Sequence, residues 1–432
     1  MKIFEKMSIS TVRICFLTAS LMLLSTLAGK EGKMNYTAAR YSVDETDVHP
    51  YILPPLAGKE PLTAKSWQER RRPEILQLLK DECYGELLPA PDRTEVTLLN
   101  EKHGALGGTA IRREVKITFV MTDGREHSVI MLVYLPAKRS GKVPAFLGLN
   151  FKGNHHTTGE TDVLPTGGEF VESGHALQQH RWCFDKVIAR GYASATICYH
   201  DLHPDKINNT GKSVFALFFP RERYPQIMEK YSVIGAWAWG LSRAYEVLSA
   251  MPEIAGDRVI VHGHSRLGKT ALWAGASDQR FAMVISNNSG CGGAALHKRK
   301  FGENLSQHFE AHVQRGVPVW FVRKLHDYIG KEETLPFDAH YLLALIAPRQ
   351  LCVASATEDL SADPRGEFLA CAAAAEVYSC FGYPPFAAGK MPGAGEHVPG
   401  IIHYHLRKGI HDQTPHDWER YLDAADRYFK QP

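Results

Sequence analysis

The sequence lacks several patterns that would assign it to a specialised class of protein. It has no CxxC motif, which excludes zinc ribbons and thioredoxin-like redox sites. It has no internal repeat, no low-complexity tract and no basic block beyond Arg70-Arg71-Arg72. The net charge is only +3 and both signs are spread along the chain, so we predict no nucleic-acid partner. The remaining composition, 44% apolar and 22% charged residues, is that of a globular protein.

Long hydrophobic runs are equally scarce, and the one from Ile14 to Ala28 follows several basic residues at the N-terminus. It spans about 15 residues, fewer than the roughly 20 that cross a membrane. Thr26 and Ala28 are small, as a cleavage site requires. We predict that residues 1–28 are a signal peptide, that the mature protein is periplasmic or secreted, and that it has no membrane association after cleavage. An uncleaved anchor is the alternative, whereas a lipid anchor lacks the Cys it would need.

Cysteine usage is compatible with export. Of eight cysteines, Cys15 would leave with the signal peptide, and an odd number would remain. At least one thiol is therefore free. Cys198 and Cys352 follow apolar residues and are interpreted as small buried hydrophobes.

The rest of the chain divides into a polar, Pro-rich extended segment at 29–64 and one domain at 65–432. Ser66 is predicted to cap the first helix of this domain. Strands are predicted at Glu114–Val120, His127–Tyr134, Ala145–Asn150, Ala193–Cys198, Arg258–His262, Met283–Ser286 and Leu351–Ser355. Further helices are predicted at Val233–Ala250, Gly366–Ser379 and His416–Phe429. Hairpin-like early strands and later apolar strands separated by helices indicate an α/β fold, a three-layer sandwich with a mostly parallel central sheet.

One segment combines a strand, a tight turn and a helix, and it allows two functional interpretations. As a nucleophile elbow, it would place the Ser265 hydroxyl at the apex of the turn, beside a helix N-terminus. Leu267 stands where the strict G-x-S-x-G pattern has Gly, and Gly268 follows one place later. As a phosphate loop, Gly263–Thr270 matches G-x-x-x-x-G-K-[ST]. The predicted export and the lack of a later strand ending in a magnesium-binding Asp favour the elbow.

An elbow serine needs a base and a carboxylate that orients the base, in the chain order Ser, acid, His. Ten histidines follow Ser265, and His411 is the predicted base because it lies on the loop before the last helix, after Gly409 and before the turn-forming Pro415. Glu358 and Asp359 directly follow a predicted strand, at the edge where α/β sheets bind ligands. Asp359 is the predicted acid and Glu358 is the alternative.

Several motifs together resemble the glucuronoyl esterases, carbohydrate esterase family 15, of bacterial type and of the α/β-hydrolase superfamily. The elbow Gly-His-Ser-Arg-Leu-Gly-Lys resembles the G-C-S-R-x-G-K elbow of that family. Further matches lie at 150–155, 234–243, 289–295, 301–303 and 363–368, so that the resemblance covers about residues 45–429.

The resemblance implies roles for individual residues. Ser265 matches the nucleophile and His411 the base. Arg266 matches the residue that stabilises the oxyanion, and Lys269 and Glu303 match contacts to sugar hydroxyls. The family's reaction splits the ester between 4-O-methyl-glucuronic acid on xylan and a lignin alcohol.

Three departures from the family pattern concern the same site. Fungal members carry the acid at the position of Asn288, whereas some bacterial members carry it at the position of Asp359. In fungal members a disulfide joins the residue before the Ser to the residue after the His. His264 and Asp412 occupy those two positions here, which allows a His–Asp contact instead. Bacterial members usually have a Trp at the position of Ser361.

We therefore predict a secreted serine esterase, a carboxylic ester hydrolase of the 4-O-methyl-glucuronoyl methylesterase type, acting as a monomer on glucuronoxylan or lignin–carbohydrate esters. The alternatives are another carbohydrate esterase on the same scaffold, acting on acetyl or uronate methyl esters, a nucleotide-binding protein, and a non-catalytic polysaccharide-binding relative. No cofactor and no metal are predicted, because His155-His156 and His403-Tyr404-His405 lack a matching carboxylate pattern and are interpreted as loop residues.

Overall fold

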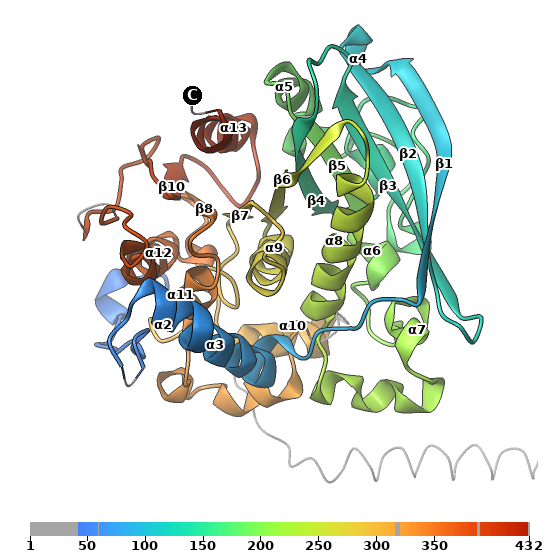
Figure 1. Ribbon diagram of the computed structural model, residues 1–432. Coiled ribbons are helices and arrows are strands. Elements are labelled where there is room, and N and C mark those ends of the chain that lie inside the picture. Colours follow the sequence, from blue (N-terminus) through green and yellow to red (C-terminus); the bar gives the residue numbers. More distant parts are fainter. Residues whose placement is uncertain (1–41, 59, 316–319, 387–388, 431–432) are drawn as a thin grey trace, which may run out of the picture. The chain divides into compact units, whose positions relative to one another are not determined.

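A ten-stranded sheet lies at the centre of the part of the chain that the computed structural model describes, residues 42–430 without 59, 316–319 and 387–388 (Figure 1). The predicted signal peptide, residues 1–28, lies outside this part, as does the first portion of the predicted extended segment 29–64. Within the described residues, no helix is both long and apolar enough to cross a bilayer.

The strand order in the sheet is β1-β2-β3-β5-β4-β6-β7-β8-β10-β9. The first three strands form an antiparallel meander, and β5, β4, β6, β7, β8 and β10 run parallel to one another. The strands are β1 Arg93–Gly104, β2 Ala110–Val120, β3 Glu126–Pro136, β4 Val143–Asn150, β5 Ala193–Cys198, β6 Ile254–His264, β7 Met283–Asn287, β8 Gln350–Ala356, β9 His397–Val398 and β10 Ile402–Arg407.

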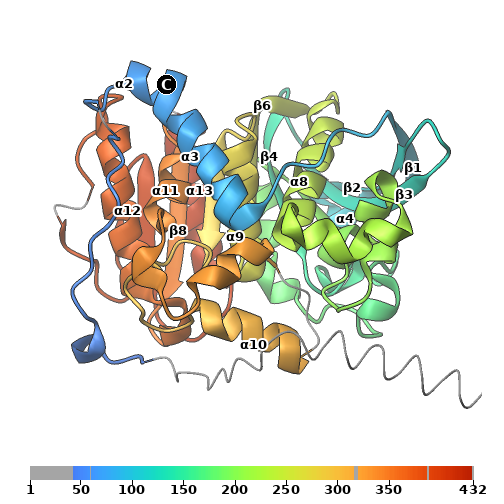
Figure 2. The same cartoon turned by 90° about the horizontal axis from the view of Figure 1, so that it is seen from below.

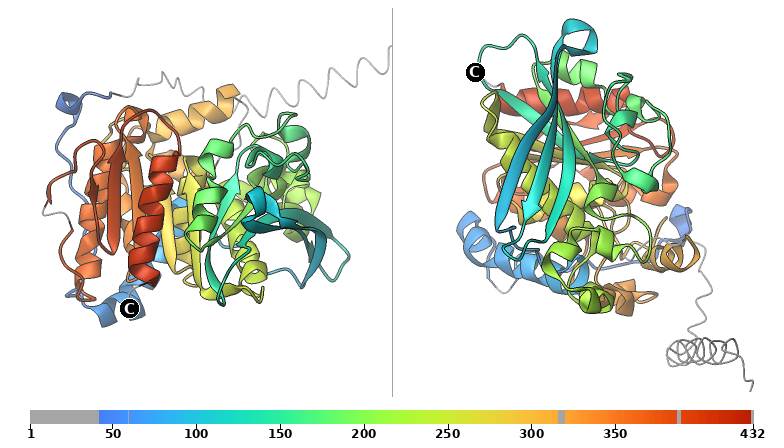
Figure 3. Two further views of the ribbon diagram at one scale, coloured as in Figure 1. Left: turned by 90° about the horizontal axis from the view of Figure 1, so that it is seen from above. Right: turned by 90° about the vertical axis from the view of Figure 1, so that its right-hand side faces the viewer.

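Helices cover both faces of the sheet, which gives three layers (Figure 3). The long helices α8, α9 and α12 lie on one face, and α5 and α13 lie on the other (Figure 1). The α-helices are α2 Ala64–Ser66, α3 Arg72–Leu79, α4 Ala105–Gly108, α5 Phe184–Ala189, α6 Tyr199–Leu202, α7 Phe215–Phe218, α8 Val233–Ser249, α9 Arg266–Ser277, α10 Leu305–Arg315, α11 Ala339–Ala344, α12 Pro364–Ser379 and α13 Pro415–Phe429. On the outer side of this helix layer, α3 lies in front of α9 in the view from below (Figure 2), and the Arg72 guanidinium donates to the Ala276 carbonyl at 2.6 Å.

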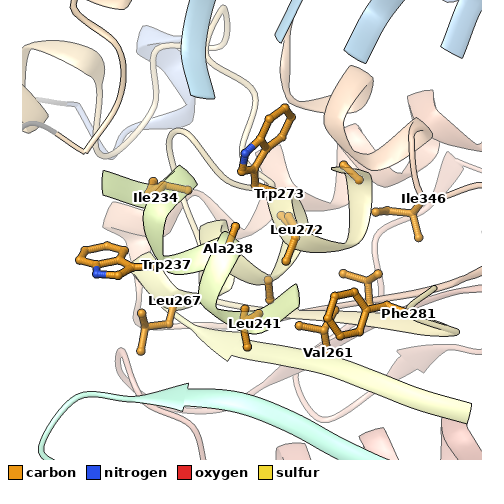
Figure 4. Close-up of a cluster of buried hydrophobic side chains, with 14 of the residues drawn as sticks. Ile234, Trp237, Ala238, Leu241, Val261, Leu267, Leu272, Trp273, Phe281 and Ile346 are labelled. Atoms are coloured by element: carbon orange, nitrogen blue, oxygen red, sulfur yellow. The ribbon is translucent and has the colours of Figure 1, made fainter. Parts of the chain in front are cut away.

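The main core lies between the sheet and the pair α8 and α9 (Figure 4). Trp237 and Leu241 of α8 and Leu267 and Leu272 of α9 belong to this cluster, and all four are almost fully buried. Each helix carries a row of aliphatic and aromatic side chains at helical spacing. These apolar faces are removed from water only when the two helices pack against each other and against the sheet, which explains why both form. This packing holds the start of α9, and with it the turn before α9, in a fixed place.

The predicted α/β class with a mostly parallel central sheet is confirmed, and each predicted strand overlaps an observed one. Three observed strands were not predicted: β1, the two-residue β9 and β10. β1 is an edge strand whose side chains are nearly all exposed, so its sequence lacks the apolar pattern that predicts a strand. β10 escaped because the run His403-Tyr404-His405 is polar, so its interpretation as a loop was wrong. The prediction that Ser66 caps the first helix was also wrong: Thr63 is the N-cap, and Ser66 completes its capping box.

Candidate active site

Ser265 occupies a strained turn between β6, which ends at His264, and α9, which begins at Arg266. Its φ of 58° and ψ of −131° lie outside the regions that non-glycine residues favour. The chain returns on itself so closely that a Cβ on Gly263 would lie 2.0 Å from the Leu267 carbonyl oxygen. Only glycine fits there, which is the physical reason for Gly at this place in the motif.

His411 and Asp359 meet at the carboxyl ends of β10 and β8. The His411 Nδ1 and the Asp359 Oδ2 are 2.5 Å apart. Burial favours the neutral acid, yet the hydrogen bond and the charge of His411 keep the pKa of Asp359 below its ordinary value. Asp359 is therefore a buried carboxylate whose partner is the His411 ring.

Two further side chains hold the Asp359 carboxylate in place. The Asn288 amide donates to its Oδ2 at 2.6 Å, and the Ser361 hydroxyl donates to its Oδ1 at 3.0 Å. Both residues are departures from the family pattern that the sequence showed, and both contact the acid. The alternative acid, Glu358, is exposed, so the geometry favours Asp359 as the partner of His411.

The contact that the sequence allowed between His264 and Asp412 does not form. The His264 Nδ1 lies 2.6 Å from the Asn287 side-chain oxygen, and the His264 ring lies 4.5 Å from that of His411. Asp412 instead accepts from Arg181 at 2.6 Å. Burial lowers the pKa of His264 well below its ordinary value, so a neutral ring packs beside His411 and has no charge to attract a carboxylate.

Arg266, the first residue of α9, has a side chain that is held by two residues, Asp205 and Trp320. Its guanidinium pairs with Asp205 and lies over the Trp320 ring at 4.6 Å. Asp205 also accepts from the Trp320 indole nitrogen at 2.9 Å. At the first position of the helix, the Arg266 backbone N–H lies among the donors that have no acceptor within the helix. The Arg266 cation is thus fixed directly after Ser265.

Lys269 and Glu303 line the same cavity as Ser265. The Lys269 ammonium donates to the Ser289 carbonyl at 2.6 Å and lies 3.4 Å from the Glu303 carboxylate. The His308 Nε2 also lies 3.4 Å from Glu303. Burial acts to raise the pKa of Glu303, but His308 and Lys269 outweigh it and hold that pKa below its ordinary value. Glu303 is therefore an anion among donors, suited to accept from hydroxyl groups.

Two cavities meet at Ser265. One of about 430 Å³ contains the polar group of Lys269, Glu303 and His308 together with Trp320. The other, of about 390 Å³, is lined among others by Phe151, Phe170, Lys152, Arg181 and Lys206. Ser265, Arg266 and His411 line both cavities. A substrate bound across both would have one part on each side of the serine, as an ester has on each side of its scissile bond.

The predicted site residues Ser265, His411, Arg266, Lys269 and Glu303 thus all line one cavity, and Asp359 lies behind His411. Sequence reasoning missed Asp205, His308 and Trp320. None belongs to a local motif, and each reaches the site through the tertiary fold. The one available signal was the absence of an aromatic residue at position 361, which leaves an apolar wall to be supplied from elsewhere.

Comparison with known proteins identifies the family. Residues 194–382 match the family model described as "Glucuronyl esterase, fungi". Carbohydrate esterase MZ0003, from an unknown prokaryotic organism, is 39% identical over 96% of this chain and 98% of its own. The chain belongs to the glucuronoyl esterases of carbohydrate esterase family 15. It is a carboxylic ester hydrolase on the α/β-hydrolase fold, as predicted.

Two other family members have the same identity to this chain but match it over very different lengths. A solved glucuronoyl esterase from Solibacter usitatus is 36% identical, with a TM-score of 0.82 over 89% of this chain and all of that one. The 4-O-methyl-glucuronoyl methylesterase 1 of Phanerochaete chrysosporium is 36% identical over a shorter region, 35% of this chain and 33% of its own. Membership of an esterase family places Gly263–Thr270 in an esterase, which leaves the phosphate-loop alternative without support.

Proposed function

We propose that this glucuronoyl esterase hydrolyses esters of (4-O-methyl-)glucuronic acid on xylan, and thereby cleaves lignin–carbohydrate ester links, after export to the periplasm or beyond through residues 1–28. The observation that carries the proposal is the shared cavity, in which a strained serine, an acid-paired histidine and an anionic hydroxyl acceptor converge. The ester class is that of the relatives, which include a 4-O-methyl-glucuronoyl methylesterase and a glucuronoyl esterase.

In the proposed mechanism, the Ser265 hydroxyl attacks the uronoyl carbonyl and His411 takes its proton. Asp359, on the Nδ1 side of His411, keeps the other ring nitrogen free to act as base and stabilises the imidazolium that forms. The negative charge on the carbonyl oxygen is stabilised by the Arg266 backbone N–H and guanidinium. His411 then protonates the leaving alcohol, and water hydrolyses the acyl-enzyme by the same steps.

The two cavities support a division of the substrate. The side with Lys269 and Glu303 offers a cation and an anion to sugar hydroxyls, so we assign the uronic acid to it. Trp320, from the segment after α10, supplies an aromatic surface there in place of the Trp expected at position 361. The side with Phe151 and Phe170 then takes the alcohol part.

Hydrolysis of benzyl glucuronate, compared with release of acetate from acetylated xylan, tests this assignment. The wild-type protein should release benzyl alcohol, and Ser265→Ala should lower kcat at least about 10³-fold while the far-ultraviolet circular dichroism stays unchanged. Release of acetate without cleavage of benzyl glucuronate would instead support the second candidate, a deacetylase, which Ser361 in place of the expected Trp favours. Nucleotide binding by the purified chain would return the phosphate loop to consideration.

Export is a separate part of the proposal and needs a separate test. Expression of the full-length chain in a bacterium, followed by fractionation and N-terminal sequencing, should yield a mature protein that begins just after Ala28. A cytoplasmic protein that retains Met1 would contradict it.

A further inference from the structure

A group of metal-ligating side chains lies outside the active site, under α13. Cys352 of β8 and His403 and His405 of β10 offer a sulfur and two ring nitrogens that all lie within 4.8 Å of one another. Because β8 and β10 are parallel, with Cys352 opposite His403, the two histidines two residues apart point to the same face as the thiol. All three residues are at most 1% exposed.

The hydrogen bonding of these rings is incomplete, which is unusual for buried imidazoles. Within the described residues, neither nitrogen of His403 nor the Nδ1 of His405 has a hydrogen-bond partner. A neutral imidazole always carries one N–H, so at least the donor of His403 is buried without an acceptor. A buried polar group without a hydrogen-bond partner destabilises a protein core unless a ligand such as a metal ion binds it.

The His405 ring is oriented as metal-bound histidines are. Its Nε2 is 2.9 Å from the Asp417 Oδ1, and Asp417 is itself held by the Thr414 backbone N–H and hydroxyl at 2.8 and 2.9 Å. A carboxylate behind one ring nitrogen fixes the tautomer that presents the other, here Nδ1, to a cation. In this tautomer the free Nδ1 of His405 carries a lone pair and no proton.

We propose that Cys352, His403 and His405 bind a divalent cation of the zinc class. Thiolate and imidazole together are the ligand set that zinc prefers. A tetrahedral zinc ion would set its ligand atoms roughly 3.3–3.7 Å apart, so side-chain shifts of about 1 Å close the site. The ring of the half-buried His397 of β9 stacks on that of His403 at 5.4 Å, which makes His397 the candidate for a fourth ligand.

Binding requires two neutral imidazoles and a thiolate. Each ring donates a lone pair from one nitrogen, and the Cys352 thiol releases its proton to solvent when the sulfur–metal bond forms. The thiolate neutralises one charge of the dication, whereas the Asp417 carboxylate also pairs with the Arg407 guanidinium at 2.9 Å.

The position of the site gives it a structural function. Cys352 and His403 lie near the starts of β8 and β10, whereas Asp359 and His411 follow the opposite ends of the same strands. A metal there joins the two strands that deliver the acid and the base, and Asp417 links it to α13. The site is therefore distinct from the chemistry at Ser265.

Cobalt spectroscopy on the whole chain tests the proposal. After removal of bound metal with a chelator under reducing conditions, titration with Co²⁺ should give one equivalent bound per chain. The spectrum should show a sulfur-to-cobalt charge-transfer band in the near ultraviolet and the visible bands of a tetrahedral ion. Zn²⁺ should remove both features and raise the thermal midpoint by a few degrees.

Variants identify the ligands. Cys352→Ala should abolish the charge-transfer band, whereas Cys371→Ala, which removes an equally buried thiol on α12, should leave it intact. His397→Ala should weaken binding but retain the band. A band that persists in Cys352→Ala would overturn the proposal. If that variant does not fold, the wild-type protein still decides: no cobalt band and no shift of the thermal midpoint with Zn²⁺ would also overturn it.

Discussion

Asp359 is the residue on which the proposed catalysis depends most after the serine. Its carboxylate contacts His411 and is held by Asn288 and Ser361. Asp359→Asn should lower kcat by up to about 10⁴-fold, because an amide cannot stabilise the imidazolium and favours the wrong tautomer. Steady-state kinetics on benzyl glucuronate measure this loss.

Glu358→Gln provides a matched control, since Glu358 is the adjacent acid but is exposed. It should retain wild-type activity. Asn288→Ala should lie between the two variants, because it removes one donor to Asp359 but keeps the charge. If Glu358→Gln were inactive and Asp359→Asn were active, Glu358 and not Asp359 would be the acid that pairs with His411.

Arg266 and Lys269 line the same cavity but should affect different kinetic constants. Arg266→Ala should lower kcat by about 10²–10³-fold, the effect of losing one oxyanion donor. Lys269→Ala should mainly raise KM, since contacts to hydroxyls are made equally in the ground and transition states. Separate kcat and KM values for the two variants distinguish these roles. An unchanged kcat in Arg266→Ala would remove its guanidinium from the oxyanion site.

The turn between β6 and α9 is the element that sets the geometry of the site. In Gly263→Ala, the new Cβ would meet the Leu267 carbonyl oxygen at 2.0 Å, so backbone must move and carry Ser265 with it. We expect a loss of kcat of about 10²-fold, the scale of a misplacement of 1 Å. A crystal structure or kinetics of the folded variant would measure the displacement or its effect.

Gly268→Ala is a smaller steric change in the same turn and helix start. There the nearest atoms to a new Cβ are 3.1 Å away, a distance that small shifts can relieve. This variant should keep most of the activity. Equal losses in the two variants would mean that the close approach at Gly263 is not what positions the serine.

At the scale of the whole molecule, buried neutral histidines should make stability depend on pH. Burial lowers the pKa of His262 to about 3 and the pKa values of His203 and His200 to about 4. Histidine in the unfolded chain titrates near 6.5. Between these values the unfolded state binds more protons, so the free energy of unfolding falls as the pH falls, by up to about 1.4 kcal/mol per pH unit for each histidine.

Thermal midpoints between pH 7 and pH 5 measure this effect. His262→Phe keeps the ring contacts with Phe146, Trp182 and Trp418 but cannot be protonated, so its midpoint should fall less steeply than that of the wild type. The same substitution at exposed His49 should leave the slope unchanged. A wild-type midpoint that stays constant over this range would contradict the prediction.

The sequence by itself determined those features of the protein that depend on residues close together in the chain. Apolar runs separated by helical patterns determined the α/β class, and the glycine-flanked turn marked Ser265, because periodicity and backbone strain are local properties. Chain order and the loop before the last helix were enough to select His411, and the position after a predicted strand narrowed the acid to Glu358 or Asp359.

Tertiary structure alone decided the rest. The side-chain directions after β8 separated Asp359 from Glu358, and the pairing of β10 with β8 turned a polar run into a buried strand. Trp320 and Asp205 reach Arg266 from segments far away in the sequence. Contacts of this kind depend on how the layers pack, and no spacing along the chain records which side chains the packing brings together.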